Sequence, residues 1–140
     1  MPKKVDRARR REEEEAVHAA AEARWLMTRV GKVAYIASDV TGVMRVLYDQ
    51  GAALVIMHEP RGRMSGWTGP APKYTVGANP ARVAIPGELD LRPLFVKLSA
   101  MEPSGHPWGG QAGIGGSPRE DGGSGLTAEQ VIRAVREYLL

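Results

Sequence analysis

The chain has 140 residues, of which 43% are apolar and 25% are charged, and it contains no cysteine. This length suits one domain with a hydrophobic core, and the lack of cysteine excludes a disulfide framework and a thiolate zinc site. No apolar run approaches the roughly 18 residues that a membrane span needs, and no apolar signal-peptide core follows Met1. We therefore predict a cytoplasmic protein with no membrane partner.

Positive charge is concentrated at the N-terminus. Residues 1–11 contain six lysines and arginines and one aspartate, which gives a local net charge of +5. The remaining residues include thirteen basic and fifteen acidic side chains, a net charge of −2. The globular part is therefore not a basic nucleic-acid binder by bulk charge, and phosphate recognition there requires a few placed groups.

A stretch without glycine or proline predicts one long helix over residues 5–30. Within it the arginines up to Arg11 precede the run Glu12–Glu15, so i,i+4 pairs of opposite charge form in the less favoured order. The apolar stripe is narrow before Val17 and broad after it, so the early turns are expected to be solvated or held by a partner. This pattern favours a solvated or domain-connecting helix, and a nucleic-acid or protein-binding arm is the alternative.

The rest of the chain alternates strand and helix signals. Short apolar runs predict strands over residues 32–38, 52–58, 73–77 and 81–85. Apolar residues at helical spacing predict helices over 42–50 and 90–101, and the capping box Thr127–Gln130 predicts a final helix. The first two strands and the helix between them form a βαβ unit. The predicted fold class is α/β, with a mixed β-sheet of about five strands flanked by helices and a long N-terminal helix.

Most catalytic motifs are absent from the sequence. No H-E-x-x-H, G-x-S-x-G, phosphate-binding Walker loop or dinucleotide fingerprint is present. The pair His58-Glu59 ends a predicted strand, where α/β proteins place ligands. Adjacent strand residues point to opposite faces, so a hydrogen-bonded strand-end histidine is favoured over a metal ligand. We assign no catalytic residue, metal ligand or cofactor to this chain.

The glycine-rich stretch after the predicted helix over 90–101 is the strongest candidate for a binding site. Its glycines allow backbone amides to approach a ligand and to form a concave nest that favours an anion. His106 is a hydrogen-bond donor for a phosphate, and Trp108 offers a flat face on which a base can stack. A flexible linker is the alternative, although linkers rarely interleave such residues with glycine. The candidate residues are Ser104, Gly105, His106, Pro107, Trp108, Gly109, Gly110 and Gln111.

The segment Ser104–Pro107, followed by Gln111–Gly113, resembles the Gly-Gly-Gly-His-Pro…Ala-Gly signature of the DHHA1 domain. That domain is the C-terminal substrate-binding half of DHH phosphoesterases of the RecJ type, and a variant occurs in alanyl-tRNA synthetases. The order of predicted elements also agrees with the family. The resemblance covers residues 25–140, with residues 1–24 as a charged helix or linker, and its specific motif is the glycine loop.

The resemblance implies that the glycine loop grips the phosphate or base end of a nucleotide or single-stranded nucleic acid. Hydrolysis in the family belongs to an N-terminal domain that binds two manganese ions, and nothing in this chain matches that domain. The chain departs from the signature because Pro103 and Ser104 replace its first two glycines, and proline lacks an N–H. Where family members carry a Ser/Arg pair, this chain has Asn79 with Arg82 nearby. Further phosphate contacts are expected from Arg61, Arg63 or Arg119.

These observations predict a non-catalytic module that binds a nucleotide or the end of a nucleic acid. Two alternatives follow from the same resemblance. One is a protein-interaction subunit of a replication or repair complex, a RecJ-like scaffold that meets its partner through residues 1–25. The other is the C-terminal fragment of a DHH phosphoesterase, whose manganese belongs to the missing catalytic domain.

Overall fold

The computed structural model describes residues 3–60, 73–81, 89–118 and 123–140, with side chains from Arg7 onward. Its elements are α1 (Lys3–Ala20), β1 (Arg24–Thr28), β2 (Gly31–Ala37), α2 (Val43–Asp49), β3 (Leu54–Glu59), β4 (Lys73–Ala78), α3 (Arg92–Met101), β5 (Gly109–Gly110), β6 (Ile114–Gly116) and α4 (Ala128–Tyr138). The six strands form one sheet in the order β1-β2-β3-β4-β6-β5. The predicted α/β class, with a mixed sheet and a long N-terminal helix, is confirmed.

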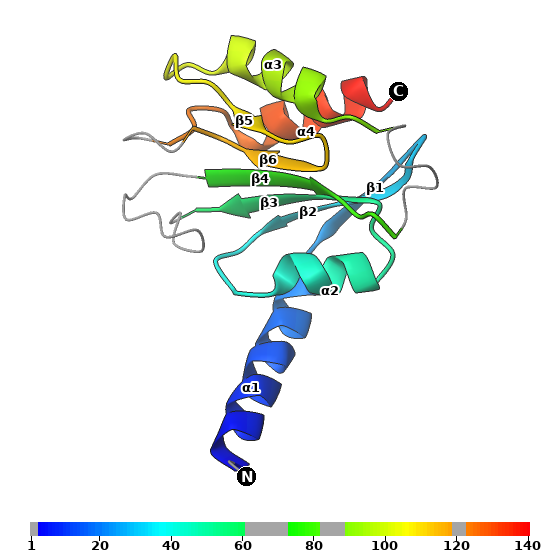
Figure 1. The fold of residues 1–140 in the computed structure, drawn as a ribbon, viewed down its shortest axis with the longest axis vertical. Helices are drawn as coiled ribbons and strands as arrows, with labels where there is room; N and C mark the ends of the chain where they lie inside the picture. The colour runs from blue at the N-terminus through cyan, green and yellow to red at the C-terminus, as the bar shows by residue number, and fades with distance from the viewer. Residues whose placement is uncertain (1–2, 61–72, 82–88, 119–122) are drawn as a thin grey trace.

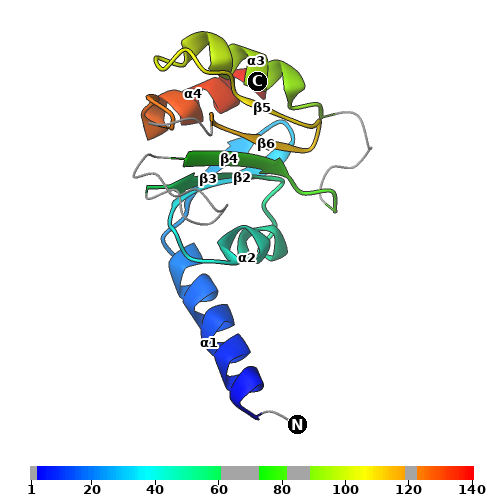
Figure 2. The same cartoon turned by 60° about the vertical axis from the view of Figure 1, so that its left-hand side comes forward.

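The centre of the sheet is the predicted βαβ unit. β2 and β3 pair in parallel, with Val33 opposite Leu54, and α2 connects them. All other strand pairs are antiparallel. Helices α1 and α2 lie on one side of the sheet and α3 and α4 on the other, while the N-terminal part of α1 projects away from the body (Figures 1 and 2). The sheet therefore separates two apolar cores.

Alternating strand residues supply the two cores. One core joins Leu54 and Ile56 of β3 to α3 and α4, and Val131 and Val135 of α4 are buried in it. The other core joins Val55 of β3 to α1 and α2. Because successive strand side chains point to opposite faces, the wholly apolar run of β3 serves both layers.

The prediction of one helix over residues 5–30 is wrong in its last third. α1 ends at Ala20, and Arg24–Thr28 forms β1, which pairs with β2 so that Trp25 lies opposite Ala34. Gly31 enters β2 with φ 120°, a conformation that disfavours other residues. The alanine-rich sequence favours helix, but ladder hydrogen bonds along β2 outweigh a propensity difference of a few tenths of a kcal/mol per residue.

The glycine-rich stretch contains more regular structure than the predicted loop. Gly109–Gly110 and Ile114–Gly116 form a short antiparallel hairpin, and β6 pairs with β4, so β5 is the outer strand of the hairpin. The predicted strand over 81–85 falls almost wholly in residues 82–88, outside the described residues. The capping box is confirmed, since the Thr127 and Gln130 side chains each accept the other residue's backbone N–H, at 3.2 and 2.9 Å.

Candidate functional site: a glycine-lined cleft at the sheet edge

The carboxylate of Glu102 organises the turn that follows α3. Only 6% of this residue is exposed, and its two oxygens accept four hydrogen bonds. The donors are the backbone N–H groups of Ser104 (3.3 Å) and Gly125 (2.7 Å), the Ser124 hydroxyl (2.6 Å) and the Trp108 indole (2.9 Å). Burial raises the pKa of Glu102, but these hydrogen bonds together outweigh burial and hold the pKa below its usual range.

Trp108 is buried in the core, so its ring is not exposed as the stacking face for a base that the sequence predicted. The residue is 4% exposed, its ring stacks on Tyr74 at 5.8 Å between centroids, and its Nε1–H donates to Glu102. Its backbone N–H donates to Ser99 Oγ at 2.8 Å. An indole with a buried ring and a satisfied N–H contributes more to the core than to a ligand site.

The segment Gln111–Gly113 is the turn of the β5–β6 hairpin. Gln111 N–H donates to the Ile114 carbonyl at 2.8 Å across the turn. Two outside contacts hold the turn in place: Leu91 N–H donates to the Ala112 carbonyl at 2.9 Å, and Ala78 N–H donates to the Gly113 carbonyl at 2.8 Å. The second half of the predicted loop is therefore fixed to the sheet and to the start of α3.

A cleft of about 680 Å³ runs beside this hairpin. We call it the glycine cleft, because its lining includes the glycines of β5 and β6: Gly109, Gly110, Gly115 and Gly116. Four of the predicted site residues line it: Pro107, Gly109, Gly110 and, at the hairpin turn, Gln111. A Cβ at Gly115 would strike the Phe95 ring, so close packing behind the cleft requires glycine at this position.

Lys73 and Thr75 of β4, which belong to no motif in the sequence, also line the glycine cleft. Lys73 is 5% exposed and lies opposite Glu59 in the β3–β4 register. Both residues share a sheet face with Gly77, whose own Cβ position meets Tyr48 of α2. Lys73, Thr75 and Gly77 alternate along a predicted strand, and this spacing is the sequence pattern that indicates a strip without apolar side chains on one face of the sheet.

The other predicted site residues that the structure describes do not line the glycine cleft. Ser104, Gly105 and His106 form an exposed turn before it, with Gly105 at φ 79° and His106 N–H donating to Ser104 Oγ at 3.3 Å. Arg61, Arg63, Arg82 and Arg119 lie outside the described residues.

Asn79 holds the fold together instead of facing a ligand. It is buried, and its amide donates to the carbonyls of Tyr48 (3.3 Å) and Ala52 (3.0 Å), while Oδ1 accepts Ala81 N–H at 3.1 Å. These bonds connect the end of β4 to the end of α2, and they use the polar atoms that a ligand would need.

His58 is a part-buried histidine at the end of β3, as the sequence favoured. Its Nδ1 lies 2.9 Å from the Tyr35 hydroxyl, and its ring stacks on Tyr74 at 4.3 Å. Nε2 is buried and has no hydrogen-bond partner among the described residues. Burial lowers the pKa of His58, and the negative charge of Asp39 opposes that shift. Within the described ranges, no group of three or more histidine or acidic side chains is arranged to hold a metal.

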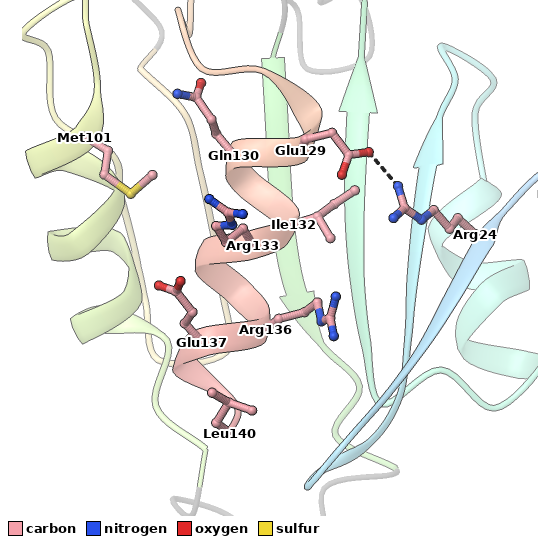
Figure 3. A pocket seen from close by; sticks show the side chains of 9 residues that line it. All are labelled: Arg24, Met101, Glu129, Gln130, Ile132, Arg133, Arg136, Glu137 and Leu140. Carbon is pink, nitrogen blue, oxygen red and sulfur yellow. Dashed lines mark hydrogen bonds and ion pairs between the residues drawn. The ribbon is translucent and has the colours of Figure 1, made fainter.

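A second groove, of about 630 Å³, lies along α4 (Figure 3). Arg24 of β1 reaches across to Glu129 at 2.6 Å, and Glu137 pairs with Lys97 at 2.7 Å. Arg133 and Arg136 add positive charge on the same helix. Positive and negative side chains are interspersed here, and both carboxylates that line the groove are paired, so the groove lacks the concentrated positive field that favours an anion.

The chain is thus an α/β domain with a glycine-lined cleft near one edge of its sheet. Comparison with protein-family models, curated proteins and solved structures finds no match for this chain. In the part of the chain that the structure describes, no helix combines the length and the apolar character that a membrane span requires.

Proposed function

We propose that this chain is a binding module for a nucleotide or for the end of a single-stranded nucleic acid, and that the terminal phosphate enters the glycine cleft. The observation that carries the proposal is the meeting of the buried Lys73 with exposed glycine backbone in one cleft. A lysine ammonium is a compact charge suited to a phosphate, and glycine permits backbone N–H groups to approach the phosphate oxygens.

The hairpin geometry supports this proposal. Gln111 N–H is bonded inward to Ile114, and inward and outward positions alternate along an antiparallel pair. The N–H of Gly110 is therefore directed to the outer edge of the sheet, because β5 is the outermost of the strands that the structure describes. It is available as a donor without the obstruction of a side chain.

The charge distribution favours recognition by a few groups over recognition by a broad field. Outside residues 1–11 the net charge is −2, so the body has no general attraction for a polyanion. We expect binding that depends on one terminal phosphate. The logarithm of the binding constant should fall with the logarithm of the salt concentration at a slope of about −1, because one phosphate contact releases about one counterion. The proposal concerns binding alone, because in the resembled family the metal-dependent chemistry belongs to a separate domain.

The test uses fluorescently labelled single-stranded DNA and RNA, each with and without a 5′-phosphate, and mononucleotides as competitors. Gly109→Asp places a carboxylate where an added Cβ meets no neighbouring atom within 4 Å, and Gly109→Asn is its neutral control of equal size. We expect Gly109→Asp to weaken binding about tenfold or more through charge repulsion. Gly109→Asn should retain most of the affinity.

Lys73→Gln removes the positive charge at the cleft and should weaken binding of the phosphorylated probes more than that of the unphosphorylated ones. Thermal unfolding of each variant shows whether the fold is preserved. Binding that is equal for phosphorylated and unphosphorylated probes, or equal for Gly109→Asp and Gly109→Asn, would contradict the proposed site. Absence of binding to every probe at low salt would overturn the proposed function.

A further inference from the structure

The first half of α1 stands clear of the domain. Figures 1 and 2 show it projecting away from the sheet, and the side chains of residues 7–15 are all exposed. Within the described part of the helix, the buried residues are Ala16 and Ala20, which contact the core beneath α2. A helix of this length exposed on all sides is marginal in water, because most helical stability in proteins comes from packing.

The exposed segment carries two blocks of opposite charge. Four arginines, Arg7, Arg9, Arg10 and Arg11, precede four glutamates, Glu12–Glu15. None of these eight side chains forms an ion pair within 4.0 Å with another described residue. The i,i+4 ion pairs expected from the sequence are therefore absent among the described residues, and their order, arginine before glutamate, is the weaker one relative to the helix dipole. The two blocks therefore remain available for contacts with another molecule.

We propose that two copies of this chain associate through α1, with the two helices side by side and antiparallel. In that arrangement the basic block of each copy faces the acidic block of the other, with a two-fold axis near Arg11 and Glu12. Arg10 then lies opposite Glu13 of the second copy, and Arg9 lies opposite Glu14. A parallel arrangement places like charges together, so the charge order selects the antiparallel one.

An apolar patch at the base of α1 adds contact area to this pairing. Val17, Trp25 and Met27 are 52%, 38% and 74% exposed. Trp25 pairs in register with Ala34, which is buried in the same core as Ala16 and Ala20, so Trp25 shares the sheet face on which α1 docks. The N-terminal turns of an antiparallel second helix run toward this patch, because α1 spans about 27 Å over its 18 residues.

The charge balance distinguishes a second copy from a polyanionic partner. Arg7–Glu15 contains four positive and four negative side chains, so nucleic acid is attracted by one block and repelled by the next. An acidic protein surface is likewise attracted by the arginine block and repelled by the glutamate block. A second α1 complements both blocks at once, and the same surface serves both copies.

The first test measures mass in solution by light scattering and sedimentation at increasing salt. We expect a dimer at low ionic strength that dissociates as salt is raised, because ion pairs at the surface are screened. Changing Arg9, Arg10 and Arg11 together to Glu gives an acidic helix, and changing Glu12, Glu13 and Glu14 together to Arg gives a basic one. Each triple variant alone should be monomeric, and an equimolar mixture of the two should restore the dimer.

Circular dichroism establishes that each variant remains folded, and the recovery of association in the mixture excludes simple unfolding as the cause of dissociation. A monomeric wild type at low salt and high protein concentration would overturn the proposal. So would dimerisation of either triple variant alone, because charge complementarity would then play no part.

Orientation is tested by cysteine cross-linking, which is straightforward because the chain has no cysteine of its own. Arg10→Cys and Glu13→Cys lie opposite each other across the proposed two-fold axis and should form a disulfide-linked dimer when the two variants are mixed and oxidised. Val17→Cys should not cross-link to itself, but it should cross-link to Arg7→Cys when the two variants are mixed. Efficient self-cross-linking of Val17→Cys would indicate parallel helices and contradict the model of pairing.

Discussion

Oε1 of Glu102 accepts a hydrogen bond of 2.9 Å from the indole Nε1–H of Trp108, and both residues are buried. The contact joins the residue that follows the last residue of α3 to the residue that precedes β5. Ser124 and Gly125 bind the same carboxylate from the segment that leads into α4. One side chain thus holds together three segments on which the position of the glycine cleft depends.

Replacing Glu102 with glutamine should destabilise the protein by about 2–3 kcal/mol. The substitution removes charge-assisted hydrogen bonds and directs an amide N–H group at other donors in a buried site. Urea unfolding measures the change in free energy. Glu137→Gln is the matched control, since Glu137 pairs with Lys97 at the surface and its loss should have a much smaller effect.

The same variant tests whether the stability that Glu102 contributes depends on pH. Because the folded-state pKa of Glu102 lies below its usual range, the stability it contributes is present above about pH 4.3 and is lost as pH falls through the folded-state value. The difference in unfolding free energy between wild type and Glu102→Gln should therefore shrink below about pH 4. A difference that stays constant down to pH 2 would show that the carboxylate charge does not matter.

We expect protonation of His58 to give a second pH dependence of stability, closer to neutral pH. Burial lowers the pKa of His58, so the unfolded chain binds a proton more readily than the folded one. Stability should fall as pH decreases below about 6.5, the ordinary pKa of histidine. Urea midpoints measured from pH 7.5 to 5 should show this slope in the wild type and lose it in His58→Phe, which keeps a ring to stack on Tyr74.

Tyr35→Phe serves as the control for the His58 variant, because it removes the hydrogen bond to Nδ1 but retains the titrating ring. The slope should persist in Tyr35→Phe. If His58→Phe keeps the wild-type slope, another group is responsible for the pH dependence.

The glycines of the hairpin should differ sharply in their tolerance of alanine. At Gly115 an added Cβ would collide with the Phe95 ring and with the Gly109 carbonyl, so we expect a loss of about 1–3 kcal/mol from overpacking. At Gly109 an added Cβ meets no atom within 4 Å, and Gly109→Ala should unfold at nearly the wild-type temperature. Equal effects of the two substitutions on thermal unfolding would show that the hairpin does not pack as described.

Much of the central fold could be predicted because its signals are local. The run Ala52–His58 is long enough and apolar enough to indicate a buried strand, and Thr127 with Gln130 marks the start of α4 within four residues. The strand Arg24–Thr28 could not be predicted in the same way, because its alanine-rich approach favours helix and its pairing partner is β2. The aromatic Trp25 and the β-branched Thr28 and Val30 were the weak signals for it.

The candidate site likewise has features that the local sequence predicts and features that only the tertiary structure shows. The sequence alone showed that the segment with Pro107 and Gln111 is rich in glycine and so permits close backbone approach, since that property belongs to the residues themselves. Only the tertiary structure decided that Trp108 is buried against Tyr74 and Glu102 and that Lys73 lies in the cleft. These positions result from strand pairing and burial between residues distant in the chain, which no local pattern records.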